Sequence, residues 1–457
     1  MTQQAHQNPD HNESLDTERA TAVRLAVQAG DAAQVAALLD PLHPADVADL
    51  FEQFSDGLRE QLIGLWQDAV DGEVLSELDE SLRDQIIETM EPAALADAVR
   101  DLDTDDVVDL VEDLDDPQAE AVLDALEDAD RAVVEQSLSY PEESAGRLMQ
   151  RELVMAPMHW TVGQAIDHLR KQQDLPEQFY HMILVDPRMK PVGYVTLGRL
   201  LGAKRAVPLL ELTEDSFRTI QATEPEEEVA YVFNQYHLIS APVVDADDRL
   251  VGVITIDDAM VVLDEEHEED ILRLAGVADG SLTDRVLETA KNRFPWLAVN
   301  LVTSILASVV IAQFESVIAA IVALAVLMPI VASMGGNAGT QSLTVAVRAI
   351  ATKDLTPSNV WRVIRREVWV GLINGLIFAV AMGIVGYIWF GMPMLGVVLA
   401  LAMIVNLVVA GLAGTVIPVV LDKLGVDPAL ASGAFVTTVT DVVGFFAFLG
   451  LAAWMLI

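Results

Sequence analysis

A single carboxylate lies inside the last long apolar stretch of the sequence. Asp441 ends the segment TTVTD, after Thr437, Thr438 and Thr440, and apolar sequence on both sides places it well inside a bilayer. A charged carboxylate at the bilayer centre costs roughly 3 kcal/mol or more, so such a residue is functional by default. No Lys or Arg lies near the middle of any apolar stretch to pair with it. We therefore expect Asp441 to bind a cation, while the threonine hydroxyls either supply further oxygens or bond to their own helix.

A second polar run lies at membrane depth in another apolar stretch. The segment PIVASMGGNAGTQ, residues 329–341, combines glycines with Asn and Gln. Small residues let helices approach closely, and exposed backbone is tolerated in a membrane only where it is buried or lines a wet cavity. Tight helix packing and a pore lining both remain open. The residues of the pore-lining alternative are Gly335, Gly336, Asn337, Gly339 and Gln341.

Outside the apolar stretches, carboxylates gather in two places. Nine acids fall between residues 101 and 116, and among them Asp105 and Asp109 share a helix face, where they repel each other unless a cation or base lies nearby. The second cluster, DEEHEED at 264–270, begins a helical segment that leads toward the first apolar stretch. Acid-rich runs are usually solvated faces. At this connection, however, a cation bound by the acids could move a helix that is attached to a pore.

The charge is divided between two parts of the chain. Residues 1–285 hold 63 of the 70 acids and 19 of the 27 bases, whereas residues 286–457 hold seven acids and eight bases. Adaptation to salt explains part of this acidity, since Arg greatly outnumbers Lys, but it does not explain acids clustered at particular places. We expect no nucleic-acid partner. The absence of cysteine excludes disulfides and thiolate metal sites.

Five apolar stretches, each roughly 20 residues or longer, are long enough to cross a bilayer. They cover residues 296–314, 317–345, 367–390, 394–421 and 428–457. If these spans alternate, every Lys and Arg of the connecting segments falls on one side of the membrane. This bias predicts a multi-pass protein of a bacterial-type inner membrane, with a cytoplasmic N-terminus and an external C-terminus. The polar N-terminus shows no cleaved export signal.

The acidic part has its own internal organisation. We expect disorder over residues 1–20 and a helical superhelix over 21–145, in which HPADVADLFEQF and EPAALADAVRDL look like copies of one unit. Over 146–265, the pattern ILVD…VGYVT recurs 59 residues later as PVVD…VGVIT. This repeat resembles a tandem pair of CBS domains, which commonly bind adenine nucleotides such as ATP; a purely structural repeat that docks on its neighbours stays open as the alternative. The ribose-binding pattern matches Thr255 and Asp258, whereas the first copy has Arg199 at the place of the Asp.

The order of these parts along the chain, an acidic helical domain, a CBS pair, an acidic connecting helix and five spans, resembles that of the MgtE family of magnesium channels. The motifs that carry this resemblance are YPEESAGRLM (140–149), PIVASMGGNAGTQ and TTVTD. It implies a homodimer embedded in membrane lipid, a plug helix over 266–293 and a five-helix transmembrane domain over 294–457, with a pore lined by the second and fifth spans. It also implies that Asp441 binds the permeating Mg²⁺. The implied cytosolic Mg²⁺ ligands are Asp105, Asp109, Asp258, Glu266, Glu269 and Asp270; His237 stands where a further sensor acid is expected.

These observations predict a Mg²⁺ channel or transporter that cytosolic Mg²⁺ closes, with no catalytic chemistry. Two alternatives stay open: a channel for another divalent cation such as Co²⁺ or Mn²⁺, and a membrane-anchored CBS signalling protein. An intramembrane enzyme is disfavoured, because the spans contain no nucleophile–base pair and no cluster of metal-binding histidines.

Overall fold

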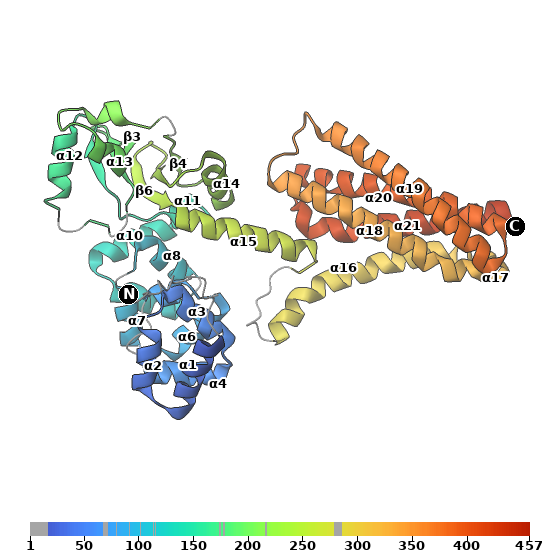
Figure 1. Ribbon diagram of the computed structural model, residues 1–457, viewed down its shortest axis with the longest axis horizontal. Helices are drawn as coiled ribbons and strands as arrows, with labels where there is room; N and C mark the ends of the chain where they lie inside the picture. Colours follow the sequence, from blue (N-terminus) through green and yellow to red (C-terminus); the bar gives the residue numbers. More distant parts are fainter. Residues whose placement is uncertain are drawn as a thin grey trace, which may run out of the picture. The chain divides into compact units, whose positions relative to one another are not determined.

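The chain divides into two compact units. The computed structural model describes residues 17–457 apart from 67–71, 79, 91, 101, 113, 115, 173–174, 177–178, 215–216 and 278–285. Unit 1 is Met1–Asp264 and unit 2 is Glu265–Ile457. Unit 1 contains short helices followed by two small sheets, and unit 2 contains long helices (Figure 1).

Short amphipathic helices form the first part of unit 1. They are α1 (Thr17–Ala29), α2 (Ala32–Leu39), α3 (Pro44–Gln53), α4 (Asp56–Trp66), α5 (Gly72–Ser76), α6 (Glu80–Thr89), α7 (Pro92–Val99), α8 (Thr104–Glu112), α9 (Asp116–Ala125) and α10 (Asp128–Leu138). Their apolar faces build one core around side chains such as Phe51, Leu82 and Leu110. The two sequence copies form α3 and α7, each with proline in the first turn, where its missing N–H is not needed.

The predicted helical N-domain is confirmed, but its start is not where we expected it. Helix α1 begins at Thr17, so the expected disorder is wrong for Thr17–Ala20. Residues 1–16 lie outside the described residues. The helical content of Thr17–Ala20 reflects the continuous run TERATAVRLAVQA, in which Ala20 and Val23 are buried in the same core.

The 59-residue repeat folds twice into the same three-stranded sheet. The strands are β1 (Met155–Pro157), β2 (His181–Val185) and β3 (Pro191–Thr196) in the first copy, and β4 (Ile220–Gln221), β5 (Ser240–Val244) and β6 (Leu250–Thr255) in the second. In each copy the first two strands pair parallel and the last two antiparallel. The helices of this part are α11 (Ala145–Leu148), α12 (Val162–Leu169), α13 (Leu197–Gly202), α14 (Glu226–Tyr236) and the short 3-10 helix η2 (Leu209–Leu212).

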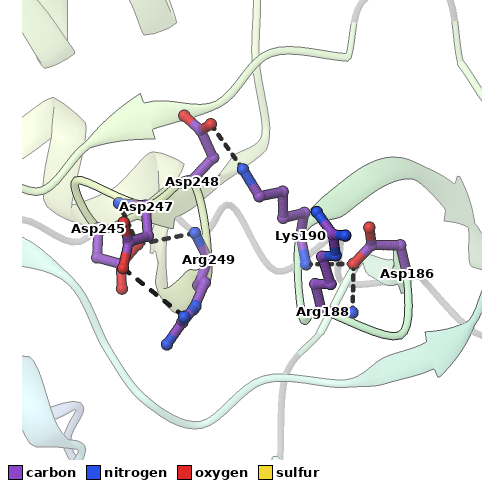
Figure 2. A network of polar contacts seen from close by, with 7 residues as sticks. All are labelled: Asp186, Arg188, Lys190, Asp245, Asp247, Asp248 and Arg249. Carbon is purple, nitrogen blue, oxygen red and sulfur yellow. Dashed lines mark hydrogen bonds and ion pairs between the residues drawn. The ribbon is translucent and has the colours of Figure 1, made fainter.

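The hairpin turns of the two copies also match and contact each other. The carboxylate of Asp186 accepts a hydrogen bond from the backbone N–H of Lys190 at 2.9 Å, and that of Asp245 accepts one from Arg249 at 2.8 Å. Lys190 Nζ then pairs with Asp248 Oδ2 at 2.9 Å, which joins one turn to the other (Figure 2). The two copies thus share their backbone conformation as well as their sequence pattern.

The helix after β6 corrects the predicted connection. Helix α15 (Ile256–Leu274) begins directly after the last strand and continues through the acidic run 264–270. A turn with Gly276 at φ +77° follows, residues 278–285 lie outside the described ones, and the next helix starts at Val286. The predicted boundaries of the connecting helix, 266 and 293, are therefore wrong: the acidic run is the second half of a helix that belongs at its start to the repeat.

Unit 2 contains five described helices that are long and apolar enough to cross a membrane. The long helices are α16 (Val286–Ala312), α18 (Ala323–Ala351), α19 (Val360–Phe390), α20 (Pro393–Lys423) and α21 (Pro428–Leu456), with the short α17 (Glu315–Ala320) before α18. The helix is interrupted at Ile321 and Val322. The predicted span 317–345 is therefore a short helix followed by a longer one.

Helix α20 is the centre of unit 2 and packs against α18, α19 and α21. Glycines allow this close packing. A Cβ placed on Gly371 of α19 would lie 2.4 Å from the carbonyl oxygen of Leu407, and one on Gly414 of α20 would lie 2.5 Å from that of Gly339 on α18. Small residues at such contacts let helix backbones meet.

Candidate functional site

Asp441 lies in the middle of α21, partly exposed, with a strip of threonines before it. The three threonine hydroxyls donate to carbonyls of their own helix: Thr437 to Gly433 at 3.0 Å, Thr438 to Ala434 at 2.5 Å, and Thr440 to Thr437 at 3.0 Å. The backbone-bonding alternative is therefore realised. Each hydroxyl oxygen still keeps acceptor capacity, because donation uses only its proton.

The glycine-rich run belongs to α18 and presents two kinds of surface. Gly335 and Gly339 are buried in contacts with other helices; a Cβ on Gly339 would lie 2.6 Å from Val436 of α21. Asn337 and Gln341 are exposed, and a Cβ on Gly336 would meet nothing within 4 Å. The tight-packing interpretation therefore holds for Gly335 and Gly339. The other three residues lie away from those packed contacts.

Sequence reasoning missed several buried polar side chains in unit 2, among them Asn406 and Glu367. Asn406 of α20 is fully buried, and Glu367 of α19 is 8 % exposed. Glu367 Oε2 accepts a hydrogen bond from the hydroxyl of Ser342, on α18, at 3.0 Å, and its Oε1 accepts from Arg366. An isolated polar residue in an apolar stretch was the available signal for Asn406, whereas Glu367 follows two arginines at the very start of its stretch.

In unit 1, three carboxylates from α8 and α15 lie within electrostatic range of one another. Burial raises the pKa of Asp105 well above its ordinary value, and the charge of Asp258 raises it further. Burial, followed by the charges of Asp258 and Asp103, raises the pKa of Asp106 to about 7. Burial raises the pKa of Asp258 to about 6, although a hydrogen bond from Thr255 opposes this shift. Two predicted Mg²⁺ ligands, Asp105 and Asp258, are thus brought together, and Asp106 joins them.

The Asp105 side chain is only 9 % exposed, and its Oδ1 has no hydrogen-bond partner among the described residues. An acid in such a place is unfavourable when it is charged, unless a cation compensates it. Asp109, one turn later, is different. Its Oδ2 pairs with Arg83 Nη1 at 2.6 Å, so a base already compensates this predicted ligand.

The acidic half of α15 contacts the ends of the membrane helices within unit 2. Arg273 pairs with Glu269, one turn earlier, at 2.6 Å, and with Asp427 at 3.3 Å. Asp427 is the N-cap of α21, where its Oδ1 accepts from the backbone of Ala429 at 2.7 Å. Burial and the nearby charge of Asp427 raise the pKa of Asp270, which Arg273 partly opposes.

Apolar packing strengthens this junction. Leu274, the last residue of α15, contacts the buried cluster formed by Leu343 and Val347 of α18 and by Ala429 and Val436 of α21. The predicted plug ligands Glu269 and Asp270 therefore lie next to the start of the helix that carries Asp441. Glu266 lies one turn before Asp270 on α15 and is partly exposed.

The predicted ribose-binding pair is in contact. Thr255 Oγ1 donates to Asp258 Oδ2 at 2.7 Å, at the junction of β6 and α15. At the equivalent place in the first copy, Arg199 pairs with Glu214 at 2.8 Å. His237 ends α14 in a left-handed conformation, with φ +53°. No group of three or more acidic or histidine side chains among the described residues is already arranged to hold a metal ion.

Comparisons with known proteins agree with this architecture. A family model described as a divalent cation transporter matches residues 328–451, the MgtE intracellular N domain matches 42–143, and CBS domains match 145–206 and 211–265. The magnesium transporter MgtE of Thermus thermophilus is 32 % identical over 97 % of this chain and 99 % of its own length. The magnesium transporter MgtE of Enterococcus faecalis is 35 % identical over 70 % of this chain and 71 % of its own.

Among solved structures, the cytosolic domain of the Mg²⁺ channel MgtE in complex with ATP is similar. It has 29 % identity and a TM-score of 0.49, and the match covers 53 % of this chain and 99 % of that domain. Near full-length similarity to a curated relative, together with matches to all three domain models, establishes the family. The chain belongs to the MgtE family of magnesium transporters, which are membrane proteins and not enzymes.

Proposed function

We propose that the protein is a Mg²⁺-selective channel for magnesium uptake and that cytosolic Mg²⁺ closes it. The observation that carries the conduction part is Asp441, a carboxylate retained in the middle of a membrane-spanning helix. Mg²⁺ gives up its water reluctantly and is usually held by one or two carboxylates together with several waters. One Asp441 from each subunit of a homodimer would suit such a hydrated ion, together with the threonine oxygens of α21 and the exposed amides of Asn337 and Gln341 on α18, which packs against α21.

The gating part rests on the buried carboxylates of unit 1 and on the acids of α15. Without a cation, burial disfavours the charges of Asp105, Asp106 and Asp258, and repulsion from neighbouring acids adds to this; both effects raise the pKa values of the three carboxyls. Mg²⁺ bound by these acids and by those of α15 removes the repulsion. Mg²⁺ therefore shifts the population toward the closed state, because it binds that state more tightly than the open one.

The α15–α21 junction supplies the route from these acids to the pore helices. Glu269 and Asp270 lie on a helix whose last residue packs against α18 and α21. Movement of α15 would therefore displace the residues at the start of α21 that it contacts. The basic connecting segments favour a cytoplasmic N-terminus, and the Thr255–Asp258 contact supports a nucleotide such as ATP as a second ligand of the same region.

Mg²⁺ uptake by proteoliposomes that contain the full chain tests the proposal. Wild type should take up Mg²⁺ at low internal Mg²⁺ and stop at high internal Mg²⁺. Asp441→Asn should lose uptake, whereas the matched control Asp422→Asn, an exposed acid at the end of α20, should not. Normal uptake by Asp441→Asn would refute the pore assignment.

The same assay separates the alternatives. Faster uptake of Co²⁺ or Mn²⁺ than of Mg²⁺ would identify a channel for another divalent ion. No ion uptake under any condition, by protein that is folded, would favour a membrane-anchored CBS signalling protein.

A further inference from the structure

Asn406 lies fully buried on α20, between the two helices that carry the polar membrane motifs. A Cβ placed on Gly335 of α18 would lie 2.2 Å from Asn406 Nδ2, and one placed on Gly444 of α21 would lie 2.8 Å from the same atom. Both glycines therefore leave the room that the Asn406 side chain occupies, and any larger residue at either place would displace it. Gly444 lies three residues after Asp441, so the two share a side of α21.

The amide of Asn406 has a defined orientation. Its Nδ2 donates to the carbonyl oxygen of Val331, on α18, at 2.8 Å. A flipped amide would set two oxygens against each other, so the bond to Val331 fixes which atom faces α18. This hydrogen bond crosses between helices, in contrast to those of the threonine hydroxyls of α20 and α21.

The other end of the same amide is unsatisfied. Asn406 Oδ1 is buried and has no hydrogen-bond partner among the described residues. Val331 lies inside α18, so its carbonyl oxygen also takes part in the helical hydrogen-bond pattern and is not left unpaired when the amide is removed. Replacement of the half-satisfied amide by an apolar group of similar shape should therefore cost little stability, and the presence of Asn calls for a reason other than packing.

We propose that Asn406 is a positioning residue for ion permeation. Its side chain spaces α18 and α21 through Gly335 and Gly444, and its bond to Val331 fixes the register of α18. Together these contacts set the place of Asp441 relative to the polar residues of α18. The inference rests on the proposed role of Asp441, because a spacing matters for conduction only if that carboxylate handles the ion.

The test compares Asn406→Leu with wild type in the full-length protein. The variant should melt at the same temperature as wild type or higher. Its Mg²⁺ uptake should nevertheless fall by about 10–100-fold, the scale of loss when a residue that orients a metal ligand is replaced. Its uptake of Mg²⁺ relative to Ca²⁺ should also fall. A purely structural residue would not move that ratio in a protein of unchanged stability.

Thr415→Val is the matched control. Thr415 is equally buried on α20, but its hydroxyl donates to Gly411 of its own helix, at 2.8 Å, and to no other helix in the described part of the chain. This variant should keep both the rate and the Mg²⁺-to-Ca²⁺ ratio. An Asn406→Leu protein that transports like wild type, or one that is less stable than wild type, overturns the inference.

A size exchange separates spacing from the hydrogen bond. Gly335→Ala alone should abolish folding or transport, because its methyl group would overlap the amide. Adding Asn406→Ala should restore folding but leave the Mg²⁺-to-Ca²⁺ ratio low; restored selectivity would refute the role of the Val331 bond.

Asp441→Asn in the same assay distinguishes the two proposals. If it conducts normally, the pore assignment fails; if it is inactive while Asn406→Leu is normal, only the positioning role fails.

Discussion

Neutralising Asp258 should stabilise unit 1 in the absence of Mg²⁺. Its pKa is raised from 3.8 to about 6, a difference worth about 3 kcal/mol at 1.36 kcal/mol per unit. Because the folded state binds the proton more tightly, stability falls as the pH rises through about 4 to 6 and is constant above. Asp258→Asn keeps an oxygen that accepts from Thr255 and removes the charge. We expect a gain of about 3 kcal/mol at pH 8 and about half of that at pH 5.

Hydrogen exchange of the full-length protein measures this gain as slower exchange of backbone amides in β6 and α8. Saturating Mg²⁺ should protect wild type strongly and the variant much less, because the variant lacks a ligand and has less repulsion to relieve. Asp264→Asn, an exposed acid on the same helix, is the control and should change protection little. Unchanged protection of Asp258→Asn at pH 8 without Mg²⁺, or an equal gain at both pH values, would refute the reasoning.

The remaining predictions concern α15 and the membrane helices. Neutralising Glu266, Glu269 and Asp270 together should leave Mg²⁺ uptake active at high internal Mg²⁺; closure as in wild type would exclude them as sensor ligands. Arg273→Gln removes two partly exposed ion pairs, so without Mg²⁺ the end of α15 should open about fivefold more often, on the scale of ~1 kcal/mol. Its exchange protection should then respond more to Mg²⁺ than that of wild type, and an equal response would contradict this. Gly371→Leu places side-chain atoms against the backbone of α20 and should destabilise the protein by about 1–3 kcal/mol, measured as lower thermal stability in detergent.

Local patterns in the sequence predicted most of the architecture. The two similar segments of the helical N-domain became the helices α3 and α7, and the 59-residue repeat became two equivalent sheets. The connecting helix was misplaced because acidic composition marks the middle of α15 and not its start. Its start at Ile256 is set by the end of strand β6, which is a tertiary boundary.

The candidate site was predictable only in part, because partners distant in sequence decide the role of each residue. Asp105 and Asp109 look equivalent in the sequence, yet one is buried with a free oxygen and the other pairs with Arg83. The glycine run likewise divides into packed and unpacked residues according to which side of α18 meets α20 and α21. Asn406 carried no motif, and only the glycines facing it reveal its place.

The two copies of the repeat have opposite charges at one equivalent position. Arg199 is held by Glu214 and by the carbonyls of Leu212 and Thr213, whereas Asp258 faces other acids. One fold thus provides a neutralised half and a strained half, joined through the hairpin turns. Duplication thus lets the second copy hold a buried acid, disfavoured as a charge, at a position where the first copy holds a base that is already compensated.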